Sequence, residues 1–195
     1  EDVLLAERAL GVRRLLEGEA QAHVHLHPAD GREVVALAVE EEAAEQGLAI
    51  AQYNLGQCYE LGDGVAKDPA EAVRWFRKAA DQGVVQAQYS LGLACANGKG
   101  VPKDLAQAVA WWRKAADQGD AEAQYNLGVA YANGEGVPKD FAQAVSWRRK
   151  AADQGFVLAQ YSLGVAYANV KGVPKDIAQT ETWWRKAADQ GDAYA

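Results

Sequence analysis

The chain has 195 residues, and its 27 acidic side chains against 20 Lys and Arg give a net charge of -7. Eleven of the acids but only four arginines lie in residues 1–45, so the rest of the chain is balanced. This excludes nucleic-acid binding as a function class, because phosphates require a concentrated positive surface. The sequence has no run of about 18 apolar residues, so it predicts no membrane-spanning helix.

Residues 2–17 place apolar side chains at spacings of three and four, which predicts an amphipathic helix. The chain contains no Met, so we expect that an initiator, alone or together with a targeting segment, was removed or left out, and the localisation stays open. Residues 23–47 allow two interpretations, a small β-hairpin or the second helix of a degenerate repeat. We favour the repeat, because Ala43-Ala44-Glu45-Gln46-Gly47 aligns without a gap on the Ala-Ala-Asp-Gln-Gly that recurs downstream.

The sequence of residues 83–118 recurs at 119–154, where 26 of 36 positions are identical. Further copies occupy 47–82 and 155–190. We therefore expect an N-terminal helix and degenerate capping repeat over 1–46, four tandem repeats over 47–190, and the start of a further repeat or a C-terminal tail over 191–195.

Each repeat predicts two helices. The first has a buried stripe of small and apolar residues, such as Ala87, Leu91, Gly92 and Cys95, and it ends at Asn-Gly-x-Gly. Because a helical glycine lowers helix stability by about 1 kcal/mol, its recurrence suggests that a neighbouring backbone or Trp ring fills the space. The recurrent glycines are Gly56, Gly92, Gly128 and Gly164.

The second helix begins after a Val-Pro-Lys-Asp link, with Asp68, Asp104, Asp140 and Asp176 as expected N-caps. A tryptophan recurs on its apolar face, at positions 75, 111, 147 and 183, which favours core packing over a ligand cage. The predicted fold is all-α, a right-handed α/α superhelical solenoid of 36-residue helix-turn-helix repeats.

Two departures from the repeat carry predictions. Arg148 stands where the other copies have Phe76, Trp112 and Trp184, so we expect that position to be peripheral and hydrated. In the last copy, Thr180 and Glu181 replace Ala and Val, which predicts a partly uncovered second helix, because a carboxylate is costly in a sealed interface.

The sequence does not favour a catalytic or metal site. The serines at 90, 146 and 162 occupy positions held elsewhere by Asn or Ala, and no histidine recurs near them. The three histidines, His23, His25 and His27, would share one face if extended, but no Cys or acid lies at a ligand spacing nearby, so no metal and no cofactor is predicted. Cys58 and Cys95 are interpreted as free core thiols.

The unit AxAQYxLGxxYxxGxGVPKDxxxAxxWxxKAAxQG resembles the SEL-one-like repeat (SLR) family, which is related to tetratricopeptide repeat proteins. The resemblance implies a scaffold or adaptor that binds a protein or peptide without catalysis, and in bacteria a periplasmic or secreted location rather than a cytoplasmic one. Some cysteine-rich relatives suggest a small-molecule-binding or hydrolytic alternative, although they carry paired cysteines in each unit. A structural spacer within a longer array is a further alternative.

By analogy with tetratricopeptide arrays, the first helices would line a concave surface. Tyrosine and asparagine recur on the helix face that the core leaves unexplained. Two interpretations stay open: these tyrosines contact a partner, or they fill gaps between adjacent first helices. The candidate partner-binding residues are Tyr53, Gln57, Tyr89, Asn97, Tyr125, Asn126, Asn133, Tyr161 and Asn169.

Overall fold

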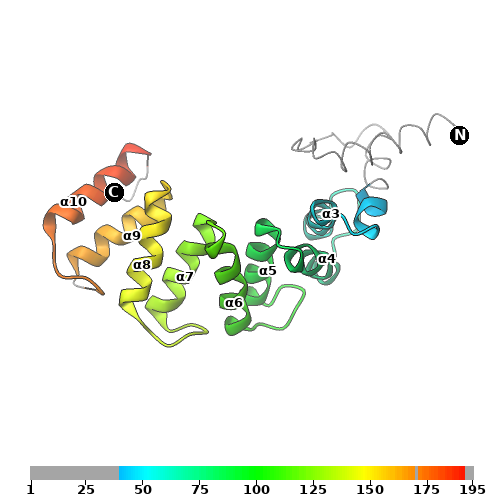
Figure 1. Ribbon diagram of the computed structural model, residues 1–195, viewed down its shortest axis with the longest axis horizontal. Helices are drawn as coiled ribbons and strands as arrows, with labels where there is room; N and C mark the ends of the chain where they lie inside the picture. Colours follow the sequence, from blue (N-terminus) through cyan, green and yellow to red (C-terminus); the bar gives the residue numbers. More distant parts are fainter. Residues whose placement is uncertain (1–39, 170, 192–195) are drawn as a thin grey trace, which may run out of the picture. The chain divides into compact units, whose positions relative to one another are not determined.

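The computed structural model describes residues 40–169 and 171–191, which form helices and connecting loops with no strand among them. A helical segment covers residues 40–45 and precedes the complete helices. These are α3 (Ala49–Leu61), α4 (Pro69–Asp81), α5 (Val85–Asn97), α6 (Leu105–Asp117), α7 (Ala121–Asn133), α8 (Phe141–Asp153), α9 (Val157–Ala168) and α10 (Ile177–Asp189) (Figure 1). The predicted all-α fold of helix-turn-helix repeats is confirmed.

The chain divides into two compact units, which are described separately. The first contains residues 1–91 and 99–102, and therefore α3, α4 and the beginning of α5. The second contains 92–98 and 103–195, and therefore the end of α5 and α6 to α10. The helix predicted over residues 2–17, the three histidines, Val170 and the tail from 192 lie outside the described residues.

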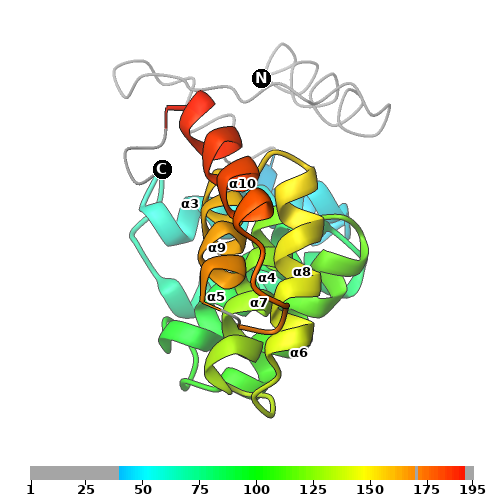
Figure 2. The same ribbon diagram turned by 90° about the vertical axis from the view of Figure 1, so that its left-hand side faces the viewer.

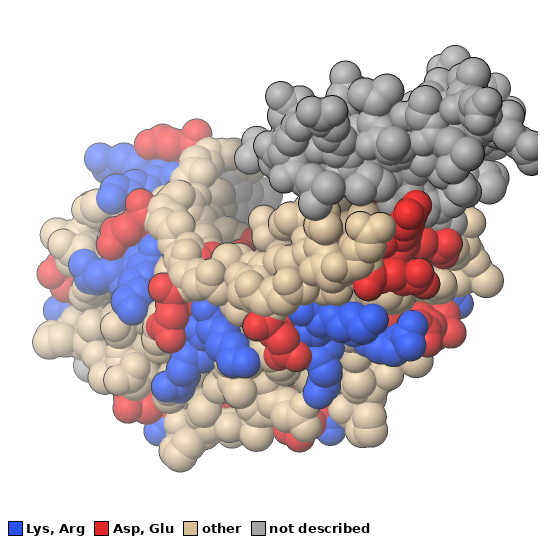
Figure 3. All heavy atoms as spheres, turned by 45° about the vertical axis from the view of Figure 1, so that its right-hand side comes forward, with Lys and Arg blue, Asp and Glu red and all other residues tan. Residues whose placement is uncertain are grey.

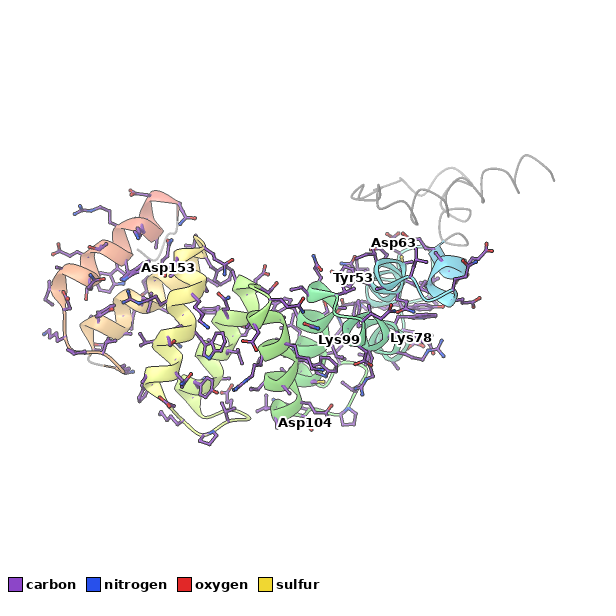
Figure 4. All side chains as sticks on the ribbon, viewed as in Figure 1. Tyr53, Asp63, Lys78, Lys99, Asp104 and Asp153 are labelled. Carbon is purple, nitrogen blue, oxygen red and sulfur yellow. The ribbon has the colours of Figure 1, made fainter. Side chains whose placement is uncertain are left out.

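Each second helix starts at the predicted aspartate cap. The Asp68 carboxylate accepts hydrogen bonds from the backbone N–H groups of Ala70 and Glu71, at 2.9 and 3.1 Å. Asp104, which Figure 4 labels at the start of α6, accepts the Gln107 N–H at 2.9 Å. Asp140 and Asp176 cap α8 and α10 in the same way. These bonds satisfy N–H groups that the helix itself leaves unpaired, which fixes where each second helix begins.

Glycine is required at two points of the loop between the helices. Gly134 ends α7 in the left-handed conformation, with φ of 78°. Two residues later, Gly136 has φ of 71°, and a Cβ atom there would overlap the backbone carbonyl of Leu105. Gly100 and Gly172 approach Pro69 and Phe141 in the same way. The loop of one repeat is therefore seated on the first turn of the preceding second helix.

Within each unit the apolar faces form a continuous core. In the second unit, Leu163 of α9 packs with Val145, Ala151 and Trp183 from α8 and α10, and Figure 2 shows α9 beside both helices. In the first unit, Leu55 and Trp75 pack with Ala43 and Ala44. Residues 40–45 are helical, and Ala43 and Ala44 pack against α3, while most of the segment 23–47 lies outside the described residues.

The helical glycines face large side chains, as the sequence suggested. A Cβ atom at Gly56 would lie 2.6 Å from the Phe76 ring, and at Gly92 or Gly164 it would meet the indole of Trp112 or Trp184.

The last second helix is partly uncovered, as predicted, since Glu181 and Ala188 are exposed. Thr180, however, is buried and donates its hydroxyl to the carbonyl of Asp176 at 2.8 Å.

Two sequence interpretations are corrected. The position of Arg148 is not peripheral: it lies inside the helical hairpin, where its Cγ would be 2.6 Å from a Cβ atom on Gly128. The tryptophan positions are not equally buried. Trp75, Trp147 and Trp183 are in the core, whereas Trp111 is only half-buried.

Candidate partner-binding face

The predicted tyrosines Tyr53, Tyr89, Tyr125 and Tyr161 are half-buried, and three of them pack against another aromatic ring. The ring of Tyr53 lies 5.7 Å from Phe76, and that of Tyr161 lies 6.4 Å from Trp184 in a stacked arrangement. Tyr125 instead packs 5.3 Å from Phe156, at the start of the next first helix. Tyr53, Tyr125 and Tyr161 are each packed against another ring and are partly accessible, so the choice between the two interpretations stays open.

We call the nine predicted residues the first-helix face, and its polar members differ in exposure. Gln57 donates to the Tyr53 hydroxyl at 2.8 Å, so this pair presents one joined polar edge. Asn97, Asn133 and Asn169 are exposed at the C-terminal ends of α5, α7 and α9, whereas Asn126 is half-buried. Asn133 donates to Glu135 at 3.1 Å. The exposed asparagines offer amide groups that suit the backbone of an extended peptide.

Near the start of the first unit, Asn54 donates to the Glu40 carboxylate at 3.2 Å. Burial raises the pKa of Glu40, the bond from Asn54 lowers it, and the negative charge of Asp63 raises it. The net effect is a raised pKa, which makes Glu40 easier to protonate than a surface glutamate.

A buried glutamine recurs on each first helix, and its role was not predicted from the sequence. Gln52, Gln88, Gln124 and Gln160 are 4 to 5% exposed. The side chain of each donates to a backbone carbonyl at the end of the preceding second helix, at 3.1 to 3.2 Å. In the sequence, the recurrence of a glutamine beside the apolar stripe could have indicated this role. A buried amide is stable only where its hydrogen bonds are satisfied.

Arg148 is the second feature that sequence reasoning misjudged. It occupies the aromatic position behind Gly128, and its Nε atom is buried without a hydrogen-bond partner. Burial lowers the pKa of Arg148, while the neighbouring Tyr125 raises it. The sequence does contain a sign of this, because a cation replaces an aromatic residue there. In other repeats, the aromatic residue at that position contacts a tyrosine of the first helix.

Several other basic side chains of the second helices contact aromatic residues. Lys78, Lys114, Lys150 and Lys186 each lie 3.7 to 4.3 Å from the centre of the tryptophan ring three residues earlier. Arg113 and Arg149 donate to the hydroxyls of Tyr131 and Tyr167. In the first unit, Lys99 and Glu60 form an ion pair of 2.8 Å. On the surface shown in Figure 3, positive and negative side chains alternate.

Among residues 40–169 and 171–191, no cluster of His, Cys, Asp and Glu could hold a metal ion. Cys58 and Cys95 are both free thiols. Burial, followed by the negative charges of Glu40 and Asp63, raises the pKa of Cys58 to about 11. Such a thiol is a poor nucleophile at neutral pH, because the thiolate is the reactive form. The search for an apolar membrane-crossing helix found none in the described part of the chain.

Comparison with protein families gives four matches to the Sel1 repeat, at residues 49–84, 85–120, 121–156 and 157–192. The match boundaries fall two residues after those drawn from the sequence periodicity. A comparison with curated proteins gave no match.

Solved structures of repeat proteins are similar to most of the chain. A protective antigen of uropathogenic Escherichia coli with an SLR fold is 38% identical, with a TM-score of 0.82 over 97% of this chain. This chain spans only 38% of that antigen. A Sel1 repeat protein from Oxalobacter formigenes is 34% identical, with a TM-score of 0.80 over 97% of this chain and 74% of its own. Cysteine rich protein B of Helicobacter pylori is 25% identical, with a TM-score of 0.52 over 65% of this chain and 93% of its own.

Proposed function

Because the chain belongs to the Sel1 repeat family, whose members are generally protein-interaction scaffolds, we propose that it is a non-catalytic scaffold that binds a protein or peptide. In each unit, the binding surface is formed by the residues of the first-helix face that the unit contains. The observation that carries this proposal is the recurrence of half-buried tyrosines on α3, α5, α7 and α9. A tyrosine held by packing offers a large contact area and loses little conformational entropy on binding.

The exposed asparagines complete the surface. Asn97, Asn133 and Asn169 recur at the same position, at the end of successive first helices. An asparagine side chain both donates and accepts, so it can satisfy the N–H and C=O groups of a bound extended segment. The aromatic residues would supply affinity and the amides would fix the orientation of that segment.

The alternative suggested by the cysteine-rich relatives has no supporting observation. Cys58 and Cys95 lie on different repeats, each in a first helix, and neither repeat holds a pair. A small-molecule or hydrolytic function would therefore need a different set of residues from the paired cysteines of those relatives.

The proposal is tested by affinity capture from an extract of the source cells with three baits. The first is the wild type, the second carries Asn97→Arg and Asn133→Arg, and the third carries Ser146→Arg on α8 as a matched exposed control. A protein identified by mass spectrometry should be captured by the wild type and by the Ser146 variant and lost with the double asparagine variant. Capture of no protein, or equal capture by all three baits, contradicts the proposal.

A further inference from the structure

Arg148 places a cation at a position that holds an aromatic ring in every other repeat. In the first unit, Phe76 fills this position and contacts Tyr53, and in the second unit Trp184 fills it and contacts Tyr161. Arg148 lies in the equivalent place beside Tyr125. Its guanidinium therefore adjoins Tyr125, whose ring packs against Phe156 of the following repeat.

Among the described residues, Arg148 forms no ion pair or hydrogen bond, and its side chain is half-buried. The Nε atom is buried and lies near Gly128 of α7, whereas the residue as a whole is partly exposed. A partly desolvated cation without a partner is unfavourable, because it has lost hydration without gaining a hydrogen bond or a counter-charge.

We propose that Arg148 binds a carboxylate of the partner, so that the occupant of the first-helix face is a peptide segment with an internal Asp or Glu. This inference rests on the proposed function and assigns the chemistry of its ligand. The terminal amino groups of an arginine match the two oxygens of a carboxylate, and a low-dielectric surround strengthens that pair. The aromatic residues on either side, Phe156 against Tyr125 and Trp184 against Tyr161, favour apolar residues next to the acid.

Charge favours a carboxylate over a phosphate. The neighbouring cations of α8 are occupied, because Arg149 contacts Tyr167 and Trp183, and Lys150 lies 3.8 Å from the Trp147 ring. Arg148 thus acts singly. One positive charge balances one carboxylate, whereas a phosphate group carries about -1.5 to -2 at neutral pH and is recognised by clusters of arginine.

An internal side chain is favoured over a C-terminal carboxylate. Arg148 lies behind the middle of α7, and the tyrosine pattern continues from Tyr125 to Tyr161 on α9. A peptide that contacts both tyrosines passes Arg148 and continues, which places the acid within the segment rather than at its end.

The test uses the full chain and libraries of N-acetylated nonapeptides that are random except at the centre. The central residue is Glu, Gln or phosphoserine with an amidated C-terminus, and a fourth library has free C-termini and no fixed acid. Binding is compared for the wild type, for Arg148→Phe, which restores the residue type found at position 76, and for Arg148→Met, which keeps an unbranched chain. Arg185→Gln, at an exposed position of α10, is the control for loss of one positive charge.

We expect the wild type and the Arg185 variant to bind the Glu library about tenfold more tightly than the Gln library. Arg148→Phe and Arg148→Met should bind both libraries equally, with circular dichroism showing that they remain folded. Peptide binding without preference for Glu, or a preference that survives either Arg148 variant, overturns the carboxylate inference and leaves the proposed function standing. Preference for phosphoserine or for free C-termini also overturns it. If no library binds to the wild type, both the carboxylate inference and the proposed function fail.

Discussion

Gln154 donates a hydrogen bond of 2.8 Å to the side-chain oxygen of Gln124, whose own amide donates to the carbonyl of Ala116 at 3.1 Å. Gln124 on α7 therefore joins the ends of two successive second helices, α6 and α8. The same pairing links Gln82 to Gln52 and Gln190 to Gln160. In a repeat array, stability depends on such nearest-neighbour contacts.

Replacing Gln124 by Leu should reduce the free energy of unfolding by about 1–3 kcal/mol. The substitution removes two hydrogen bonds: the one that Gln124 donates to the Ala116 carbonyl, which keeps only the Gly119 N–H at 3.0 Å, and the one that Gln124 accepts from Gln154. Urea unfolding followed by circular dichroism measures the loss. Gln143→Leu, at an exposed position on α8, is the control and should change stability by no more than about 0.5 kcal/mol. Equal effects of the two substitutions would show that the glutamine contacts are not important.

Gly136→Ala should be more destabilising than Gly119→Ala, although both glycines have positive φ values, 71° and 99°. Each substitution strains the backbone by about 1–3 kcal/mol. A methyl group at position 136 also collides with the Leu105 carbonyl, whereas nothing lies within 4 Å of one at position 119. Urea unfolding gives the free energy of unfolding of both variants, and the difference between their losses measures the cost of the collision. A loss at position 136 that is no greater than that at 119 would contradict the seating of the loop.

Arg148→Phe should raise the free energy of unfolding by about 1–3 kcal/mol, because it removes a buried nitrogen that has no hydrogen-bond partner. Phe76, in the equivalent position, is 2% exposed and fits against Gly56. The reverse change, Phe76→Arg, should reduce stability by about 3 kcal/mol or more. Thermal melts of both variants test this pair. A destabilised Arg148→Phe would indicate that the arginine stabilises the fold rather than serving a ligand.

Cys58 should resist alkylation in the folded protein. Its pKa is raised to about 11 by burial and by nearby acids, from its usual 9.0. This shift favours the neutral thiol, so its contribution to stability is complete below pH 9 and is lost as the pH rises through 11. In a Cys95→Ala background, iodoacetamide at pH 8 should modify folded Cys58 about a hundredfold more slowly than the urea-unfolded chain. Equal rates would contradict the raised pKa.

The sequence predicts the fold well because the repeat shows which positions must stay constant. Asp104 recurs because it caps a helix, and Gly136 recurs because it forms a turn. Both roles can be recognised in a single copy of the repeat. The collision that excludes a side chain at Gly136 is with another repeat, so it could only be seen in the structure. The burial of Trp111 and Trp147 also differs despite identical register, because burial depends on the neighbouring copies.

The candidate site is less predictable because its residues differ from copy to copy. The positions of the tyrosines follow from the register, but their packing partners do not: Tyr161 stacks on Trp184, whereas Tyr125 contacts Phe156. Arg148 looked peripheral because charged residues are usually at the surface. Only its place against Gly128 in the structure shows that the aliphatic part of the Arg148 side chain is enclosed.

The most direct measurement is photo-cross-linking from a benzoylphenylalanine placed in turn at Asn133, on the first-helix face, and at Ser146, an exposed position of α8. After incubation with the captured partner or a bound library peptide, cross-linked products are mapped by mass spectrometry. We expect cross-links from position 133 and none from position 146. Cross-links from position 146 alone would contradict the claim that the first helices form the binding surface.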